Sequence, residues 1–219
     1  MNLSLLLTAG DDPRLLLDVA READRRGLAA LWLPELEGSG LFPNPAVAAS
    51  ALAVATRRIA LRAGGIGLPL HNPIRVAEEW SLVDNLSGGR AGIAFRAFGR
   101  GDLHDVEIVR RLWRGESERV PDGEGRPIDI RILPQPIQRE LPLWMTDART
   151  AAALGANLLA LDEGEIAAYR RGGGRHVTVV AALPDLERLA AAGVDEIAIR
   201  ADLAEALSTI AIMEEIHDR

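Results

Sequence analysis

The sequence predicts a compact (β/α)8 TIM barrel, an α/β fold in which eight parallel strands alternate with eight helices. Short apolar runs alternate with amphipathic segments along the chain, and about eight such strand–helix pairs follow one another. The chain has 219 residues, 48% of them hydrophobic, which suits a single domain over 1–219. An open doubly wound sheet is the alternative. The even number of units counts against it, as does "TAGDDP" after the first strand in place of a Gly-x-Gly-x-x-Gly turn.

The first four units can be followed in order by their hydrophobic patterns. Strands are expected at 2–9, 28–34, 59–67 and 90–96, and helices at 13–27, 44–58, 73–87 and 102–115. The helix at 73–87 has the clearest ends: Asn72 can cap it, Pro73 suits its first turn, and Gly88-Gly89 stops it. Its apolar face is expected to consist of Val76, Trp80, Val83 and Leu86.

The second half begins with a polar, proline-spaced segment over 116–140, which favours a hairpin or extended chain over a helix. The alternation then resumes. Strands are expected at 141–146, 156–161, 176–183 and 194–201, and helical segments at 148–155, 163–172, 184–193 and 202–216. "RRGGGRH" (170–176) precedes a strand, so it is interpreted as a turn at the opposite barrel mouth and not as a phosphate loop.

Composition excludes several classes of function. The net charge of −7, without any Lys/Arg cluster, argues against nucleic acid as a partner. The absence of cysteine excludes disulfides, thiolate metal sites and a cysteine nucleophile. No window approaches the ~20 apolar residues of a membrane span, and no basic leader segment opens the chain. We therefore expect a cytoplasmic protein with no membrane partner and no metal site, acting on a small-molecule ligand.

Three segments carry a resemblance to a known family: "FPNPAVAASALAVATRRIALRAG", "LPLHNPIRVAEEWSLVDNLSGGRAGIAF" and "VRRLWRGE". Over 43–115 the chain resembles the bacterial-luciferase-like flavin-dependent monooxygenases, most closely their natural-product biosynthesis branch. "RILPQPIQRELPLWMT", "LGANLLA" and "AAGVDEIAI" follow in the order that this family would place them. The run from Pro69 to Arg90 is the most specific part of the resemblance.

The resemblance implies a TIM barrel that binds reduced FMN or a related flavin at its C-terminal face and oxidises an organic substrate with oxygen. It also implies a homodimer, or a heterodimer with a full-length relative, through helices near 45–57 and 73–87. Compared with that family, the loops after the strands are short: "PELEGSGLFPNP" lacks a histidine, and "RAFGRGDLHD" lacks a glycine–aromatic–histidine–proline pattern. The sequence thus leaves two functions open, a reduced-size flavin-dependent oxidoreductase and a catalytically silent barrel that serves as a partner subunit or binding module.

The catalytic candidates are His71 and Glu35, which follow the third and second expected strands and so lie on the C-terminal face. His71 suits proton transfer, but the interpretation that the sequence favours is a rim histidine packed beside the next helix cap. Glu35 is also explained as an ordinary partner of a helix dipole. Gly64 and Gly65 end the third strand, where relatives place small residues under the flavin ring. A glycine bend at the barrel rim is the alternative.

Four further residues are candidates for cofactor binding. Arg96 ends the fourth strand, where a guanidinium can donate a forked hydrogen bond to a flavin phosphate or carbonyl, and Arg100 lies close enough to substitute for it. A shift of one residue would turn Arg96 to the other face of the strand. Thr146 and Arg149, after the fifth barrel strand, are the remainder of a phosphate site, or simply the start of a helix. The four tryptophans follow core or interface spacing and need no cofactor to explain them.

Overall fold

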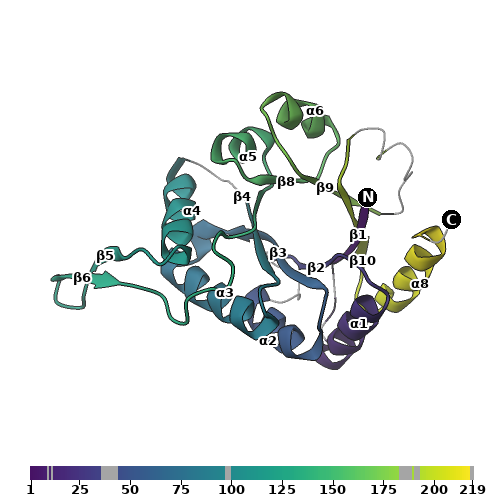
Figure 1. Ribbon diagram of the computed structural model, residues 1–219, viewed down its shortest axis with the longest axis horizontal. Helices are drawn as coiled ribbons and strands as arrows, with labels where there is room; N and C mark the ends of the chain where they lie inside the picture. Colours follow the sequence, from purple (N-terminus) through teal and green to yellow (C-terminus); the bar gives the residue numbers. More distant parts are fainter. Residues whose placement is uncertain are drawn as a thin grey trace.

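The computed structural model describes residues 1–8, 10, 12–35, 44–96, 100–182, 189 and 193–217, and for 100–102 and 216–217 the backbone alone. Its eight parallel strands form a closed barrel, shown as a ring in Figure 1. In order around the ring these are β1 (Asn2–Leu7), β10 (Glu196–Ala201), β9 (Val177–Ala181), β8 (Asn157–Ala160), β7 (Leu143–Met145), β4 (Ala91–Arg96), β3 (Ala60–Gly67) and β2 (Ala30–Leu33). The predicted (β/α)8 barrel is therefore confirmed, and the open doubly wound sheet is excluded.

Helices surround the barrel on its outside (Figure 1). They are α1 (Pro13–Arg25), α2 (Pro45–Ala55), α3 (Pro73–Ser87), α4 (Arg100–Trp113), α5 (Ala148–Leu154), α6 (Gly164–Arg171) and α8 (Ala206–His217), with a short 3-10 turn, η1 (Leu68–Leu70), before α3. The helix expected at 184–193 lies almost entirely outside the described residues. None of the described helices combines the length and the apolar character needed to cross a membrane.

The first three helices begin in the same way, with an Asp or Asn cap followed by proline. Asp12, Asn44 and Asn72 each accept hydrogen bonds from backbone N–H groups in the following turn. The proline that follows has no N–H to lose at that position, and its φ already suits a helix. These local signals explain why the expected starts of all three helices agree with the structure within one residue.

Arg90 joins the ends of two helices. Gly88 ends α3 in the left-handed conformation, at φ +72°, and the chain then turns so that the Arg90 guanidinium reaches the C-terminus of α2. Its Nη2 donates to the carbonyls of Ala53 (3.0 Å) and Thr56 (3.1 Å), and its Nη1 donates to the Ile59 carbonyl (2.6 Å). The "SGGR" segment is thus a structural clamp between α2 and α3, because one cation satisfies carbonyls that a helix end leaves without partners.

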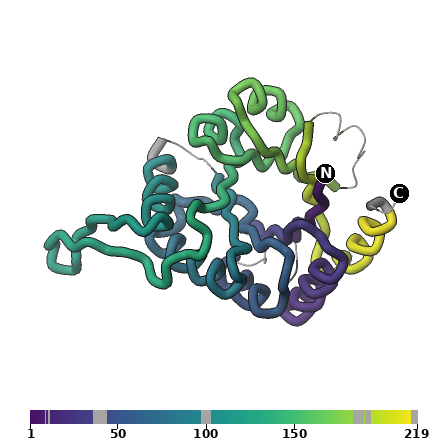
Figure 2. The backbone as a smooth tube through the Cα atoms, viewed as in Figure 1, coloured from purple at the N-terminus to yellow at the C-terminus, as the bar shows by residue number. Residues whose placement is uncertain are grey.

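A two-stranded antiparallel hairpin, β5 (Glu118–Pro121) and β6 (Pro127–Ile130), follows α4 and extends away from the barrel (Figure 2). This confirms the hairpin expected within 116–140. The chain then returns along α3, where the fully buried Asp84 carboxylate accepts hydrogen bonds from the backbone N–H groups of Ile137 (2.7 Å) and Gln138 (3.0 Å). Asp84 therefore fixes the path by which the chain enters β7.

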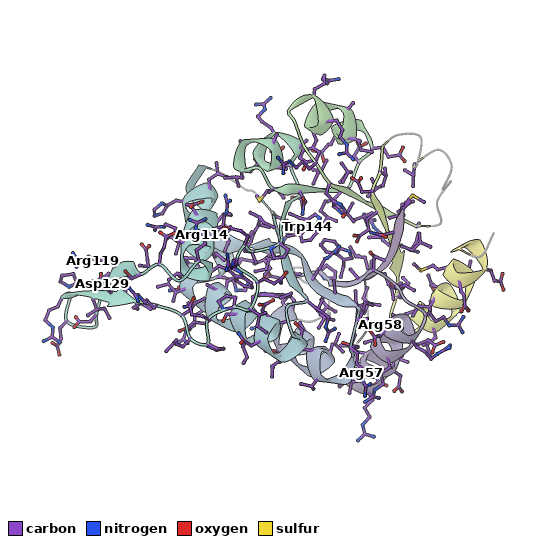
Figure 3. The ribbon with its side chains drawn as sticks, in the orientation of Figure 1. Arg57, Arg58, Arg114, Arg119, Asp129 and Trp144 are labelled. Carbon is purple, nitrogen blue, oxygen red and sulfur yellow. The ribbon has the colours of Figure 1, made fainter. Side chains whose placement is uncertain are left out.

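The buried side chains form two clusters, one between strands and helices and one inside the barrel. The interior cluster contains Leu6, Ala30, Trp32, Ala94, Trp144, Leu159, Val180 and Ala198. All four tryptophans are buried, as their spacing predicted, and Figure 3 shows Trp144 inside the ring of strands. One expectation for α3 is wrong: Leu86 is 42% exposed, because the helix turns this side chain away from the barrel.

Candidate active site

A cavity of about 310 Å³ opens at the C-terminal mouth of the barrel, where all eight parallel strands end. Its walls are mainly apolar and are formed by Leu6, Pro34, Leu159, Leu161 and Val180. The polar side chains that line it are Thr8, Glu35, Arg96, Thr146 and Arg200, and Gly64 contributes backbone. An apolar cavity with a few convergent polar groups is typical of a small-molecule site, and its volume is at the lower end of the usual range of roughly 300–1,000 Å³.

Glu35 and His71, the two catalytic candidates, are brought together at the edge of this cavity. His71 Nε2 lies 2.7 Å from Glu35 Oε1, and the backbone N–H of Gly67 donates to Glu35 Oε2 at 3.4 Å. Glu35 is buried and lines the cavity, whereas His71 is half-buried. The helix-dipole interpretation of Glu35 is therefore wrong, because its carboxylate is paired with His71 and lies ten residues before the start of α2.

Gly64 and Gly65 lie at a bulge in β3, and at each position a side chain would come too close to a neighbouring residue. The pairing register between β3 and β4 shifts between Gly64 and Ile66, which leaves Gly65 as the extra residue at φ +96°. A Cβ on Gly64 would lie 3.1 Å from the Cα of Pro34, and one on Gly65 would lie 3.0 Å from Cγ of Arg96. Contacts within the chain thus account for both glycines, and Gly64 also lines the cavity.

The four cofactor-binding candidates are not all brought together. Arg96 and Thr146 line the cavity, so the uncertainty about the register of Arg96 is resolved in favour of the inward face. Arg149 is exposed in the first turn of α5 and is not one of the described residues that line the cavity. The backbone of Arg100 begins α4, but its side chain lies outside the described residues.

A polar network below the cavity was not predicted from the sequence. Arg62 Nη1 donates to both carboxylate oxygens of Glu196, at 2.7 and 2.8 Å, and Trp32 Nε1 donates to Glu196 Oε1 at 3.2 Å. Ser4 also donates its hydroxyl proton to Glu196. The Arg62 guanidinium lies between two indoles, 4.9 Å from the ring centroid of Trp32 and 4.4 Å from that of Trp144. Each polar member thus has partners inside an otherwise apolar barrel.

The environment of Glu196 holds its carboxyl in the charged form. Burial by itself raises the pKa of this group, but the neighbouring His176, the charge and hydrogen bonds of Arg62, and the Ser4 hydroxyl together lower it to about 2. His176 Nε2 lies 3.7 Å from Glu196 Oε2. The network therefore forms a charged, hydrogen-bonded floor beneath the cavity, two to four residues earlier on each strand than the residues that line it.

The chemistry of the lining fits part of a flavin. Flat apolar walls and inward-facing guanidinium donors suit an aromatic ring system with polar atoms along one edge. The expected phosphate-binding group is less complete, since Arg149 lies outside the cavity. The N–H of Thr150 at the start of α5 donates to the Asp147 carboxylate at 2.7 Å, so it is not free to bind a phosphate. The described residues thus suit the ring of a flavin better than its phosphate.

The relatives found by comparison with known sequences include several monooxygenases. Residues 2–101 match the family described as luciferase-like monooxygenase. A luciferase-like monooxygenase of Escherichia coli K12 is 28% identical over 155 residues, which cover 64% of this chain and 46% of that protein. The oxygenase component of the flavin-dependent trigonelline monooxygenase of Acinetobacter baylyi is 26% identical over 59% of this chain and 42% of its own length. The 4-hydroxyprotoasukamycin monooxygenase of Streptomyces nodosus is 37% identical over 40% of this chain and 25% of its own length. The chain thus spans less than half of the length of these curated relatives.

Solved structures share the fold. The monooxygenase RslO1 from Streptomyces bottropensis superposes with a TM-score of 0.77 at 18% identity, covering 98% of each chain. The oxygenating constituent of 3,6-diketocamphane monooxygenase from Pseudomonas putida, solved in complex with FMN, gives a TM-score of 0.64 at 15% identity over 83% of this chain and 67% of that one. The chain thus shares its barrel fold with these monooxygenases, and over residues 2–101 its sequence resembles the luciferase-like monooxygenases.

Proposed function

We propose that the chain is a reduced-size flavin-dependent monooxygenase that binds FMN at the C-terminal mouth and oxidises a small organic molecule of the natural-product type. The observation that carries this proposal is the cavity of about 310 Å³ into which Arg96 and Thr146 project beside the Glu35–His71 pair. The similarity of residues 2–101 to luciferase-like monooxygenases, and a relative named as a flavin-dependent monooxygenase, support flavin chemistry. The Streptomyces relative that oxidises 4-hydroxyprotoasukamycin supports the class of substrate.

The residues of this chain have separate roles in that activity. A bound reduced flavin would supply the two electrons that reduce O2, so that one oxygen atom enters the substrate and the other leaves as water, and the protein would position the flavin. The Arg96 guanidinium orients the polar edge of the ring, and Leu159, Leu161 and Val180 keep water away from its face. The hydrogen bond between Glu35 Oε1 and His71 Nε2 can hold or transfer one proton at the edge of the cavity, as a general acid or base requires.

Titration of FMN followed by flavin fluorescence tests this proposal. We expect saturable quenching with a dissociation constant in the micromolar range, and a loss of affinity of about tenfold or more in Arg96→Ala. Arg126→Ala is the matched control, because Arg126 lies on the distant hairpin and pairs with Asp122. FMN binding that does not saturate would contradict the proposal, and so would equal affinity in the Arg96→Ala and Arg126→Ala variants.

A catalytically silent barrel is the second candidate, and specific contacts favour it. The Glu35 carboxylate is engaged by His71, and the space at Gly64 is filled by Pro34, so neither feature requires a ligand. The connections after β7 and β8 are also short, since α5 begins at Ala148 and α6 at Gly164. In this case the chain would stabilise a full-length relative without binding flavin, and the same titration distinguishes the two functions.

We also propose that the chain pairs through α2 and α3, as a homodimer or with a full-length relative. These helices pack side by side and present large apolar side chains to solvent. Val47 and Val54 of α2 are 67% and 71% exposed, and Leu82 and Leu86 of α3 are 44% and 42% exposed. Exposed apolar side chains gathered on neighbouring helices are typical of an interface between proteins.

A further inference from the structure

Arg200 and Arg96 face one another across the mouth of the barrel. In the closed order of eight strands, β10 and β4 are four places apart, which puts them on opposite walls. Arg200 lies next to the C-terminal end of β10 and pairs in register with Leu6, another lining residue. Side chains on a strand alternate between its two faces, so the inward-facing positions of β10 are Glu196, Ala198 and Arg200. Arg200 is the last of the three along the strand and lies at the level of the cavity.

The surroundings of Arg200 leave its guanidinium available to an anion. Two guanidinium groups line the cavity, and the one carboxylate among its described lining residues, that of Glu35, is hydrogen-bonded to His71. The nearby Asp202 carboxylate accepts the Thr8 hydroxyl at 2.6 Å. Within the part of the chain that the structure describes, no carboxylate forms an ion pair with Arg200. Arg200 is therefore a guanidinium on the wall of a mainly apolar cavity, where a bound anion can engage it.

We propose that Arg200 is a specificity-determining residue that binds the carboxylate of an acidic organic substrate, whose apolar body lies against Leu6, Leu159 and Val180. This inference rests on the proposed function, in which Arg96 on the opposite wall orients the flavin. Arginine suits this role because its planar fork can donate two parallel hydrogen bonds to one carboxylate. The resulting substrate class is a small organic acid with an aliphatic or aromatic body.

A matched pair of probes tests the charge requirement directly. The intrinsic fluorescence of Trp32 and Trp144, which belong to the same interior cluster as Leu6, Leu159 and Val180, reports occupancy of the cavity. We expect 4-phenylbutyrate to bind saturably and at least tenfold more tightly than 4-phenylbutan-1-ol, which has the same body and no charge. Arg200→Gln is expected to weaken binding of the acid about tenfold and to leave the alcohol unchanged. The control Arg175→Gln, at the opposite mouth, is expected to bind both like the wild type.

Parallel titrations with FMN and riboflavin separate a substrate carboxylate from a flavin phosphate. We expect Arg200→Gln to bind both flavins like the wild type. Weaker binding of FMN alone would assign Arg200 to the flavin phosphate and overturn the inference. Equal affinity for acid and alcohol, or no saturable binding of the acid, would also overturn it. Failure to bind flavin while the preference for the acid persists would instead contradict the proposed function and leave this inference standing.

Discussion

Replacing Glu196 by glutamine should destabilise the barrel from its centre. Glu196 is 1% exposed, and the variant would leave Arg62 with its positive charge but without the carboxylate that balances it. Breaking a buried ion pair from one side typically costs about 3–5 kcal/mol, because the remaining charge stays desolvated. The intact ion pair contributes less than this to the free energy of unfolding, because burying its two charges has already cost their hydration. Replacing both partners by apolar residues would remove that cost together with the attraction.

The pKa of Glu196 gives an independent estimate and a pH window. The value of about 2 in the folded chain lies below the ordinary value of 4.5, so the charged form stabilises the fold. This contribution is fully present above about pH 4.5 and is lost as the pH falls towards 2. The difference corresponds to about 3 kcal/mol, at about 1.4 kcal/mol for each tenfold change in the proton equilibrium.

Urea unfolding followed by tryptophan fluorescence, at several pH values between about 7 and 3, measures both effects. We expect Glu196→Gln to lose about 3 kcal/mol or more at pH 7 and to show a smaller further loss in acid than the wild type. Glu22→Gln is the matched control. The pKa of Glu22 is also lowered to about 2, through Arg25 and Arg26, but its side chain is 26% exposed on α1. Solvent screens such a pair, which is worth about 0.2–1 kcal/mol. Equal losses in the two variants would show that the buried carboxylate contributes no more to stability than the exposed one.

Three further predictions concern other parts of the molecule. Arg90→Ala should lower the free energy of unfolding by about 2–4 kcal/mol, because carbonyls at the end of α2 and the Ser87 carbonyl at the end of α3 lose a charged donor. Chemical denaturation measures this loss, and a value below about 1 kcal/mol would contradict the clamp. His71→Ala should cost about 1–3 kcal/mol, since the buried Glu35 carboxylate loses its partner. The double variant with Glu35→Leu should recover part of that loss, and strict additivity in thermal unfolding would argue against their coupling. Val54→Glu combined with Leu82→Glu should convert a dimer into a monomer, as measured by the mass in light scattering, without lowering the melting temperature of the monomer. An unchanged mass would exclude this surface as the interface.

Local signals made most of the fold predictable. Helix α3 occupies 73–87 as expected, because an Asn-Pro start and a Gly-Gly stop are encoded within a few residues of the helix they limit. Strand positions followed from apolar runs, and their closure into a ring followed from the number of units. Leu86 was assigned to the buried face because periodicity alone does not show how wide that face is.

The site was only partly predictable, because its contacts join residues far apart in the sequence. Glu35 and His71 were both candidates, but the hydrogen bond between them depends on the position of one loop relative to another. Arg62 and Glu196 are separated by 134 residues, and only the register of the closed barrel brings them together. A signal was nevertheless present: each is a charged residue at an inward position of an otherwise apolar strand. The same period of two relates Glu196 to Arg200 and would have placed Arg200 at the mouth.

A crystal structure of the chain grown with FMN would show whether the C-terminal mouth is a flavin site. We expect electron density for the flavin ring in the cavity between Arg96 and Leu159, with Glu35 and His71 at its edge. Flavin bound elsewhere on the barrel, or an open mouth in crystals grown at saturating FMN, would contradict this expectation.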